Sequence, residues 1–173
     1  MIATETIATE TSFVPDPRNP RQLRDAFGRF ATGVTIVTVA TQDGPMAITA
    51  NSFSSLSLDP PLVLWAPDKS SRRFVHFAQA EHFAIHILAS DQEDLCWRVA
   101  RDGAGLLASE LTTNAEDVPV LAGCLARFEC RRYASYDGGD HDIIVGQVIR
   151  AAQRDDGEAL TFFKGKMAGH IAR

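Results

Sequence analysis

A β-hairpin near the start of the chain is the strongest constraint that this sequence places on its fold. Residues 33–40 read GVTIVTVA, a β-branched run typical of a strand, and residues 45–51 read PMAITAN. Between them Gln42, Asp43 and Gly44 form a turn signal, and so short a connection joins only antiparallel strands. The folded part of the chain therefore opens with an antiparallel pair and not with a β-α-β unit.

Short strands separated by turns recur through the rest of the chain. From Cys124 to Cys130 every second residue is apolar, as in a half-exposed strand. The alternate charged residues, Arg127, Glu129 and Arg131, are predicted to lie on the exposed face, and the two cysteines in the core. The other predicted strands are LVLWA at 62–66, HFAIHILA at 82–89, DIIVGQVIRAA at 142–152 and ALTFF at 159–163.

The first helix is predicted to follow a flexible N-terminal tail. Residues 1–19 are acidic and Thr-rich, with no basic or apolar stretch, so they are predicted to be neither a signal peptide nor a membrane anchor. Asn19 as N-cap and Pro20 at the first helical position then begin a helix over residues 20–31. Residues 20–173 are expected to form one domain, because 173 residues with 45% hydrophobic content fill one core.

Two more short helices are predicted in the middle of the chain. One covers residues 72–80, and the other starts at Ser90, where Ser90 and Glu93 form a capping box, and continues to about residue 101. Residues 52–61 are too rich in Ser and Pro for a regular element, and residues 103–119 show no clear period. Both of these segments are predicted to be loops.

These elements together predict the fold class. Six or seven strands with hairpin connections and only three short helices do not supply the alternating βα units of a parallel sheet. The sequence therefore predicts a mainly β fold, an antiparallel barrel that is closed or nearly closed, with a few short flanking helices.

Charge and motif content exclude several classes of function. The net charge is −5 and the 17 Lys and Arg residues are scattered, which argues against a nucleic-acid partner. The sequence has no GxGxxG, P-loop, HExxH or GxSxG motif, and its three cysteines have no metal-ligand spacing. Of its five histidines only His82 and His86 have such a spacing, on one side of a predicted strand, and they lack a third ligand. No metal site is predicted, and the odd number of cysteines indicates free thiols and a cytoplasmic location.

The densest polar segment is Thr49–Ser55, TANSFSS, where a strand is predicted to leave the barrel. Small side chains there let a flat ring approach the main chain, and free backbone N–H and C=O groups can pair with an edge that both donates and accepts. The pyrimidine edge of a flavin is such an edge. The alternative interpretation is an ordinary Ser-rich turn whose hydroxyls cap their own backbone.

A second polar segment, Asp68–Ser71, precedes the predicted helix at 72–80. A helix N-terminus beside Lys69, Arg72 and Arg73 is suited to an anion such as a phosphate. The alternative is that Asp68 or one of the serines only caps the helix.

A third candidate is the turn Gly138–His141, GGDH. Turn chemistry accounts for its Gly and Asp residues, but it does not require a histidine. An imidazole held by Asp140 could donate a hydrogen bond or take part in proton transfer near neutral pH. The alternative is a surface histidine without a role.

Taken together, these segments resemble the flavin reductase-like family, the small reductase components of two-component flavin monooxygenases. The family implies an FMN-binding split barrel, a cytoplasmic homodimer and a partner monooxygenase. The matching stretches are FGRFATGVTIVT at 27–38, TANSFSSLSLDPPLVLW at 49–65, DKSS at 68–71, HFAIHILASDQ at 82–92, PVLAG at 119–123 and GGDHDIIVGQV at 138–148.

The resemblance also implies roles for individual residues. The flavin, FMN or FAD, would contact Thr35, Thr49, Ala50, Asn51, Ser52, Ser54, Ser55, Leu56 and Phe163 around its ring, and Asp68, Lys69, Ser70 and Ser71 at its ribityl and phosphate end. The nicotinamide of NADH or NADPH would lie by Asp140, His141 and Lys166, with His141 as the catalytic residue.

The implied activity is hydride transfer from NAD(P)H to FMN or FAD, which would supply reduced flavin to the monooxygenase. Two rivals remain: a flavin-binding redox sensor or electron carrier without efficient NAD(P)H turnover, and an enzyme resembling pyridoxamine-phosphate oxidase. Two positions depart from the family pattern. His86 stands where members often have Asn, and Lys164–Met167 replaces the usual Arg-x-Tyr.

Overall fold

The computed structural model describes residues 10–170, and the tail predicted at 1–19 therefore lies partly outside the described residues. Its helices are α1 (Arg21–Phe27), α2 (Phe74–Gln79) and α3 (Glu93–Arg101), with single 3-10 turns at Ser90–Gln92 and Ala108–Glu110. Its strands are β1 (Thr32–Gly33), β2 (Thr35–Thr41), β3 (Gly44–Ala50), β4 (Ser54–Leu58), β5 (Pro61–Trp65), β6 (His82–Ile87), β7 (Leu111–Thr113), β8 (Pro119–Leu121), β9 (Ala126–Gly138), β10 (His141–Gln153), β11 (Ala159–Phe163) and β12 (Lys166–His170).

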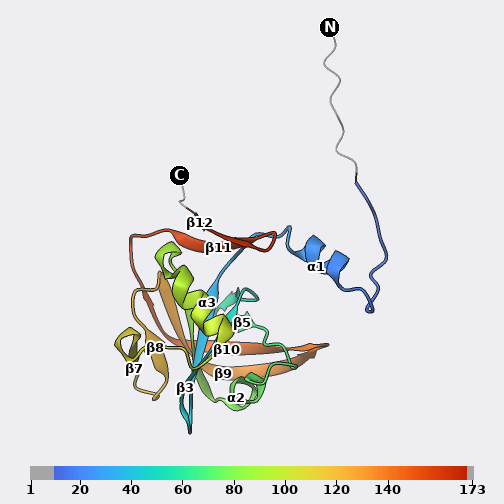
Figure 1. The fold of residues 1–173 in the computed structure, drawn as a ribbon. Helices are drawn as coiled ribbons and strands as arrows, with labels where there is room; N and C mark the ends of the chain where they lie inside the picture. The colour runs from blue at the N-terminus through green and yellow to red at the C-terminus, as the bar shows by residue number, and fades with distance from the viewer. Residues whose placement is uncertain (1–9, 171–173) are drawn as a thin grey trace.

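The strands form three antiparallel sheets. The main sheet has seven strands in the order β3-β2-β6-β9-β10-β5-β4, and the two smaller sheets are β1-β11-β12 and β7-β8. Thr41 pairs with Gly44 at the end of the β2–β3 hairpin, which confirms the first prediction from the sequence. In Figure 1 β11 and β12 cross above α3, and α1 stands to one side of the main sheet. The predicted mainly β, antiparallel fold with a few short helices is confirmed.

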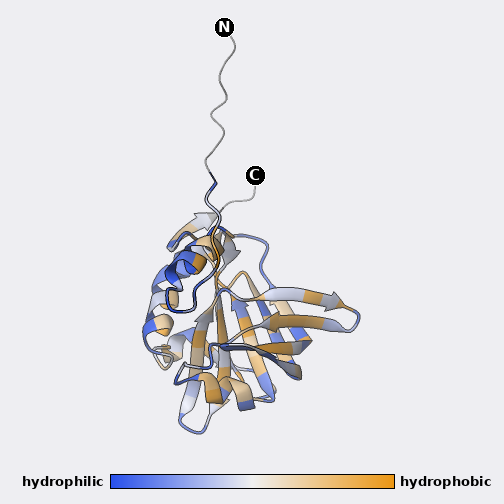
Figure 2. Cartoon of the chain, turned by 90° about the vertical axis from the view of Figure 1, so that its right-hand side faces the viewer, coloured by the Kyte–Doolittle hydropathy of each residue, from blue (hydrophilic) through white to orange (hydrophobic). Residues whose placement is uncertain are grey.

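Two clusters of buried side chains form the core, one on each face of the main sheet. Because side chains alternate along a strand, β2 gives Val37 and Val39 to one cluster, with Trp65 and Phe83, and Ile36 to the other, beneath α3. Figure 2 shows hydrophobic residues concentrated on the strands, while the turns between them are mostly hydrophilic.

The segment from β7 to β8 covers the outer face of the main sheet. Val118 and Val120 pack against Ala84 of β6. The buried His86 side chain links the two layers, since its Nε2 accepts a hydrogen bond from the Leu121 N–H at 3.0 Å and its Nδ1 lies 2.9 Å from the Ile36 oxygen. The prediction of a loop over 103–119 is therefore wrong for part of this segment, because strands of three residues leave no periodic pattern.

The same segment buries a charge that the sequence pattern predicts to be exposed. Glu129 is only 1% exposed. Its carboxylate accepts hydrogen bonds from Arg127 Nε at 2.9 Å and Asn114 Nδ2 at 2.8 Å, and it forms an ion pair with Arg150. The alternation identified the two faces of β9 correctly, but it could not show that a second layer covers the polar face. Cys130 is buried as predicted, whereas Cys124 is only half-buried.

Other element predictions also need correction. Residues 54–58 form β4, although the sequence predicts an irregular segment there. Ser and Pro residues are compatible with this strand because it lies at the edge of the sheet, next to a turn that contains Pro. The capping box of Ser90 and Glu93 is wrong. Instead, Gln92 Oε1 accepts a hydrogen bond from the Ala89 N–H at 3.0 Å, and α3 begins at Glu93.

The first helix is shorter than predicted. It begins at Arg21 and ends at Phe27, where Gly28 follows as the C-terminal cap. None of its residues is buried. The helix therefore contributes little to the core, and its side chains are available to line the surface beside it.

Candidate functional site

A cavity of about 1080 Å³ opens between α1, the crossover from β3 to β4, and the turn between β11 and β12. The first wall consists of residues between 24 and 32, and the second of Asn51, Ser52, Phe53 and Ser54. The third is formed by Phe162, Lys164 and Gly165. Of the residues that the sequence assigns to a flavin, three lie in this cavity.

A smaller cavity of about 310 Å³ is lined by residues of the same segments. Its walls are Val34, Thr49, Ala50, Asn51, Phe162 and Met167. Asn51 and Phe162 line both cavities, so the two share walls along the β3–β4 crossover. At one cleft the structure thereby brings together Thr49, Ala50, Asn51, Ser52 and Ser54.

Several hydroxyls of this segment hold the crossover in place. Thr35 Oγ1 donates to the Ala50 oxygen at 2.8 Å, and Thr49 Oγ1 donates to the Cys96 oxygen at 3.1 Å. Ser52 Oγ accepts from the Ala66 N–H at 2.9 Å and lies 3.0 Å from the Ala66 oxygen. These side chains fix the backbone that faces the cleft and have little capacity left for a ligand.

Asn51 differs from its neighbours. It is exposed, lies between the ends of β3 and β4, and its side-chain amide makes no hydrogen bond within residues 10–170. An amide both donates and accepts, which matches the edge of a flavin ring. Asn51 is therefore the side chain of this segment that is best placed to contact a ligand in the cleft.

Neither cavity is lined by the other residues assigned to the ring, Ser55, Leu56 and Phe163. Ser55 and Leu56 are exposed on the edge strand β4, and Phe163 is 42% exposed beneath the Lys164 ammonium, which is 5.0 Å from its ring centroid. Successive residues of a strand face opposite sides, and it is Phe162 that lines both cavities. The sequence pattern alone could not show which of the adjacent residues Phe162 and Phe163 faces the cleft.

Asp68 and the two serines after it form a tight local turn. Asp68 Oδ1 accepts from the Ser70 N–H at 2.7 Å, and Ser71 Oγ accepts from the Arg73 N–H at 3.3 Å. The hydrogen bonds from Ser70 lower the pKa of the Asp68 carboxyl, and the charges of His141 and Arg24 add to this effect. Arg24 of α1 and His141 of β10 therefore both act on Asp68 from distant parts of the chain.

Two of the three cations predicted to face a phosphate already have partners. The Lys69 ammonium pairs with Asp137 and with Asp142 at 3.3 Å, and its hydrogen bond to Asp137 raises its pKa. The Arg73 guanidinium turns inward and donates to backbone oxygens at 2.8 to 3.2 Å; these belong to Val99, Ala47 and Ala100. Within the described residues, only Arg72 of this group lacks an ion pair or side-chain hydrogen bond.

His141 lies at the start of β10 beside the Asp68 turn. Its Nδ1 is 2.7 Å from Asp140 Oδ1, as the sequence predicts, and its backbone forms an isolated β-bridge with Asp68. The side chain is 39% exposed. Lys166, the other residue assigned to the nicotinamide, begins β12 opposite Phe163. The structure thus joins Asp68, Asp140 and His141, and places Lys166 on a different sheet.

The cleft contains further side chains to which the sequence analysis assigned no ligand. Arg24, Arg29 and Lys164 line the larger cavity, and Met167 lines the smaller one. Thr32 also lines the larger cavity, and its hydroxyl is buried without a hydrogen-bond partner in the described part of the chain. A helix of seven residues and a short hairpin carry no recognised motif, so it is the tertiary structure that places these residues at the cleft.

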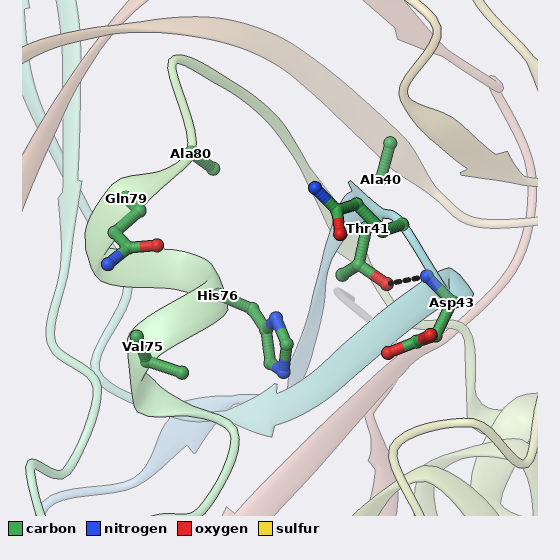
Figure 3. Close-up of a pocket in the computed structure, with 8 residues that line it drawn as sticks. Ala40, Thr41, Asp43, Val75, His76, Gln79 and Ala80 are labelled. Atoms are coloured by element: carbon green, nitrogen blue, oxygen red, sulfur yellow. Dashed lines mark hydrogen bonds between the residues drawn. The ribbon is translucent and has the colours of Figure 1, made fainter.

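Another cavity, of about 640 Å³, lies between α2 and the β2–β3 turn. In Figure 3 the His76 imidazole points from α2 toward Thr41 and Asp43 of the hairpin, where Thr41 Oγ1 accepts from the Asp43 N–H at 3.2 Å. None of the residues assigned to flavin or nicotinamide lines this cavity. It provides sites for control substitutions.

Neither a metal-binding cluster nor a membrane-spanning helix is found in residues 10–170. These residues contain no group of three or more His, Cys, Asp or Glu side chains that could hold a metal ion, and none of their helices is long and apolar enough to cross a membrane. Burial raises the pKa of the Cys96 thiol to about 11 and that of Cys130 to about 12. Both thiols are therefore neutral at pH 7 and poor nucleophiles.

Known proteins share both the sequence and the fold. Residues 27–170 match the family model for the flavin reductase like domain. The chain is 54% identical over 156 residues to the FMN reductase (NADH) SmoA of Agrobacterium fabrum, which covers 90% of this chain and 89% of that protein.

Two further relatives extend the comparison. The chain is 46% identical over 130 residues to the reductase component of the flavin-dependent trigonelline monooxygenase of Acinetobacter baylyi, covering 74% of this chain but only 42% of that protein. The solved structure of the NADH:FAD oxidoreductase SgcE6 of Streptomyces globisporus superimposes with a TM-score of 0.85 and 36% identity, over 96% of this chain and 95% of that one.

Proposed function

Because the chain belongs to the flavin reductase-like family, we propose that it uses NADH to reduce FMN and delivers the reduced flavin to a monooxygenase. The observation that carries the proposal is the cleft at the β3–β4 crossover, with Asn51 where its two cavities share a wall. The choice of FMN and NADH rests on the SmoA relative, which is named as an NADH-dependent FMN reductase. A monooxygenase partner is supported by the relative named as a reductase component.

The residues of the cleft fit a flavin. Its walls combine aromatic side chains, a backbone held open between two strands and the free amide of Asn51. A bound flavin would supply the electron-accepting chemistry, and the protein would supply binding and orientation. We assign the ring to the Asn51–Ser54 crossover and the ribityl chain to the Asp68–Ser71 turn.

The side chains then act mainly by positioning. Thr35, Thr49 and Ser52 hold the crossover rigid through their backbone hydrogen bonds. Reacting atoms held about 3 to 3.5 Å apart need little further help from the protein. His141, oriented by Asp140, is assigned to seat the nicotinamide or to donate a hydrogen bond to the reduced flavin.

Steady-state oxidation of NADH and NADPH, measured with FMN, with FAD and without flavin, tests the proposed function. We expect NADH oxidation that depends on added flavin and is faster with FMN. The rival function, a redox sensor or electron carrier, predicts instead a purified protein that keeps its flavin and oxidises NAD(P)H poorly. A visible spectrum of the purified protein separates the two.

Replacing His141 with Ala is expected to lower kcat/KM for NADH by roughly five- to 150-fold, the effect of losing one polar contact worth about 1 to 3 kcal/mol. Flavin affinity and Tm should change little, because His141 is partly exposed at a turn. Asn at this position should restore part of the activity if hydrogen bonding is the role. His76→Ala is the matched control, and unchanged kinetics in His141→Ala would assign His141 to the surface turn alone.

We also propose that the main sheet forms an FMN-binding split barrel with an open edge, and that the protein is a homodimer in the cytoplasm. β4 ends the seven-stranded sheet and carries Leu56 and Leu58, which are 51% and 96% exposed. Tyr136 of β9 is 59% exposed. An open strand edge with exposed apolar side chains is a surface that a second copy can cover.

Light scattering coupled to size exclusion is expected to give twice the chain mass of 18.8 kDa. Leu58→Asp on the edge strand should shift the mass toward one chain, because it places a charge in the covered surface. Val14→Asp, at a residue that is 90% exposed outside the sheet, is the control. A protein that reduces flavin at full rate with the mass of one chain would contradict the dimer.

A further inference from the structure

Three cations line the larger cavity, and only one of them, Arg24, acts on a described carboxylate, Asp68, through its charge alone. Arg24 and Arg29 come from α1 and the residues after it, and Lys164 comes from the β11–β12 turn. None of them takes part in an ion pair or a side-chain hydrogen bond within residues 10–170; Lys164 only stacks over Phe163. We propose that Arg24, Arg29 and Lys164 bind the phosphate of a nucleotide in this cleft. The inference rests on the proposed function, in which FMN and NADH are the nucleotides that bind there.

The sequence pointed elsewhere for the phosphate. It predicted Lys69, Arg72 and Arg73, but Lys69 pairs with two aspartates and Arg73 donates to three backbone oxygens. A cation whose donors are already satisfied gains little from a phosphate, whereas an unpaired one gains a charge-assisted hydrogen bond. Of the predicted group only Arg72 stays unpaired in the described residues, and it does not line the larger cavity, whereas the three unpaired cations on α1, after it and at the β11–β12 turn do.

Backbone contacts keep these two segments together. The Lys164 N–H donates to the Gly28 oxygen at 2.8 Å, and Thr32 of β1 pairs with Phe162 of β11. The residues that carry the three cations are thus held at one end of the cavity by the sheet and not by their own side chains. The side chains remain free to contact a ligand.

The charge of the cavity also contrasts with that of the whole protein. The chain carries a net charge of −5, yet the cavity lining has three cationic side chains and one acidic one, Asp25. A locally positive cleft in an acidic protein concentrates anionic ligands and leaves cationic ones outside. This distribution favours a phosphate over an uncharged or basic substrate.

The rest of the lining suits a nucleotide and not an inorganic anion. Phe27 and Phe30 are 68% and 77% exposed although they belong to the cavity wall, and Phe53 and Phe162 face the same space. Aromatic faces beside cations accommodate a flat base next to its phosphate. The buried, unpartnered hydroxyl of Thr32 supplies one more hydrogen-bonding group in the same wall.

Two pairs of ligands, each with one member that contains phosphate and one that does not, test whether the three cations bind a phosphate. The variant Arg24→Gln/Lys164→Gln is titrated with FMN and with riboflavin, following quenching of flavin fluorescence. Its KM is measured for NADH and for 1-benzyl-1,4-dihydronicotinamide, which has no phosphate. We expect at least about a tenfold weakening for FMN or for NADH, the loss of about one charge-assisted hydrogen bond, and no change for the phosphate-free partner.

The identity of the affected pair distinguishes the two sources of phosphate. A loss confined to FMN assigns the cations to the flavin, and a loss confined to NADH assigns them to the nicotinamide dinucleotide. Asp25→Asn should have the opposite sign and tighten binding of the same ligand, because it removes the one acidic side chain of the lining. Arg21→Gln, on the same helix but outside the cavity wall, is the matched control and should match the wild type.

Other results would overturn the inference. Equal weakening with and without the phosphate would mean that the cations shape the cleft, and unchanged binding of all four ligands would mean that they do not contact a nucleotide. Tm should stay constant, because α1 buries no residue. If the wild type itself failed to oxidise NADH with any flavin, the proposed function would fail, whereas an active wild type with unaffected variants would refute only this phosphate site.

Discussion

Glu129→Ala is expected to lower the free energy of unfolding by about 3 kcal/mol, the lower end of the range for breaking a buried ion pair. The carboxylate is 1% exposed and connects Asn114, Arg127 and Arg150 beneath the β7–β8 layer. The value lies at the lower end because the arginines, at 27% and 45% exposure, regain water when the carboxylate is lost. Urea denaturation at pH 7 measures the change.

The control for this substitution is Glu81→Ala, because Glu81 is exposed and its side chain makes no hydrogen bond in the described structure. It should change the unfolding free energy by less than about 0.5 kcal/mol. Glu129→Gln keeps the side-chain volume and removes the charge, so it separates the ionic contribution from the cavity. A loss below about 1 kcal/mol in Glu129→Ala would show that the cluster is solvated and not a structural link between the layers.

Acidification from pH 7 to pH 5 is expected to cost about 2 kcal/mol of stability through His86 alone. Burial lowers the pKa of His86 to about 4, while its usual value is 6.5. Between these two pKa values His86 is protonated in the unfolded chain and neutral in the folded chain. The contribution of neutral His86 to stability is therefore complete above pH 6.5 and disappears as the pH falls toward 4. The whole shift is worth roughly 3 kcal/mol.

The geometry explains why the folded state excludes this proton. His86 Nε2 accepts the Leu121 N–H, so protonation would set two donors against each other in the core. His86→Asn should flatten the dependence of unfolding free energy on pH between 7 and 5, whatever it does to stability at pH 7. Denaturation curves at several pH values provide the test, and an unchanged slope in the variant would exclude His86 as the titrating group.

The stabilisation that the Glu129 carboxylate provides is not lost between pH 7 and pH 5. Burial alone would raise its pKa, but hydrogen bonds from Asn114 and Arg150 and the charges of Arg127 and Arg150 outweigh burial and lower it below 4.5. Its stabilisation is therefore complete above pH 4.5 and is lost only below that value. The interval between pH 7 and pH 5 isolates the histidine.

Local sequence patterns predicted most of the main sheet. The β2–β3 hairpin, β6 and β10 follow from β-branched runs and turn residues, whose effects are local. What the patterns missed depends on contacts between distant segments. The burial of Glu129 requires residues 111–121 to fold back over β9, and no property of residues 124–131 by themselves could indicate that.

The candidate site shows the same division. The crossover at Thr49–Ser54 was identifiable because small polar residues follow a strand, and the structure places it at the cleft. The resemblance to the family implied a ligand role for the segment that contains Lys69. The side-chain partners of Lys69 and Arg73, however, can be seen only in the folded chain. Sequence shows which cations exist near a turn, and tertiary contacts decide which of them remain free.

The pairing of β1 with β11 has a consequence for synthesis of the protein. Thr32 and Gly33 are joined to Phe162 and Thr161, and the cleft walls lie on either side of this junction. On a ribosome, the first wall emerges long before its counterpart. Both cleft walls are therefore present only after residues 159–165 leave the exit tunnel, so a nucleotide can stabilise the finished chain but not the early β2–β3 hairpin or β6.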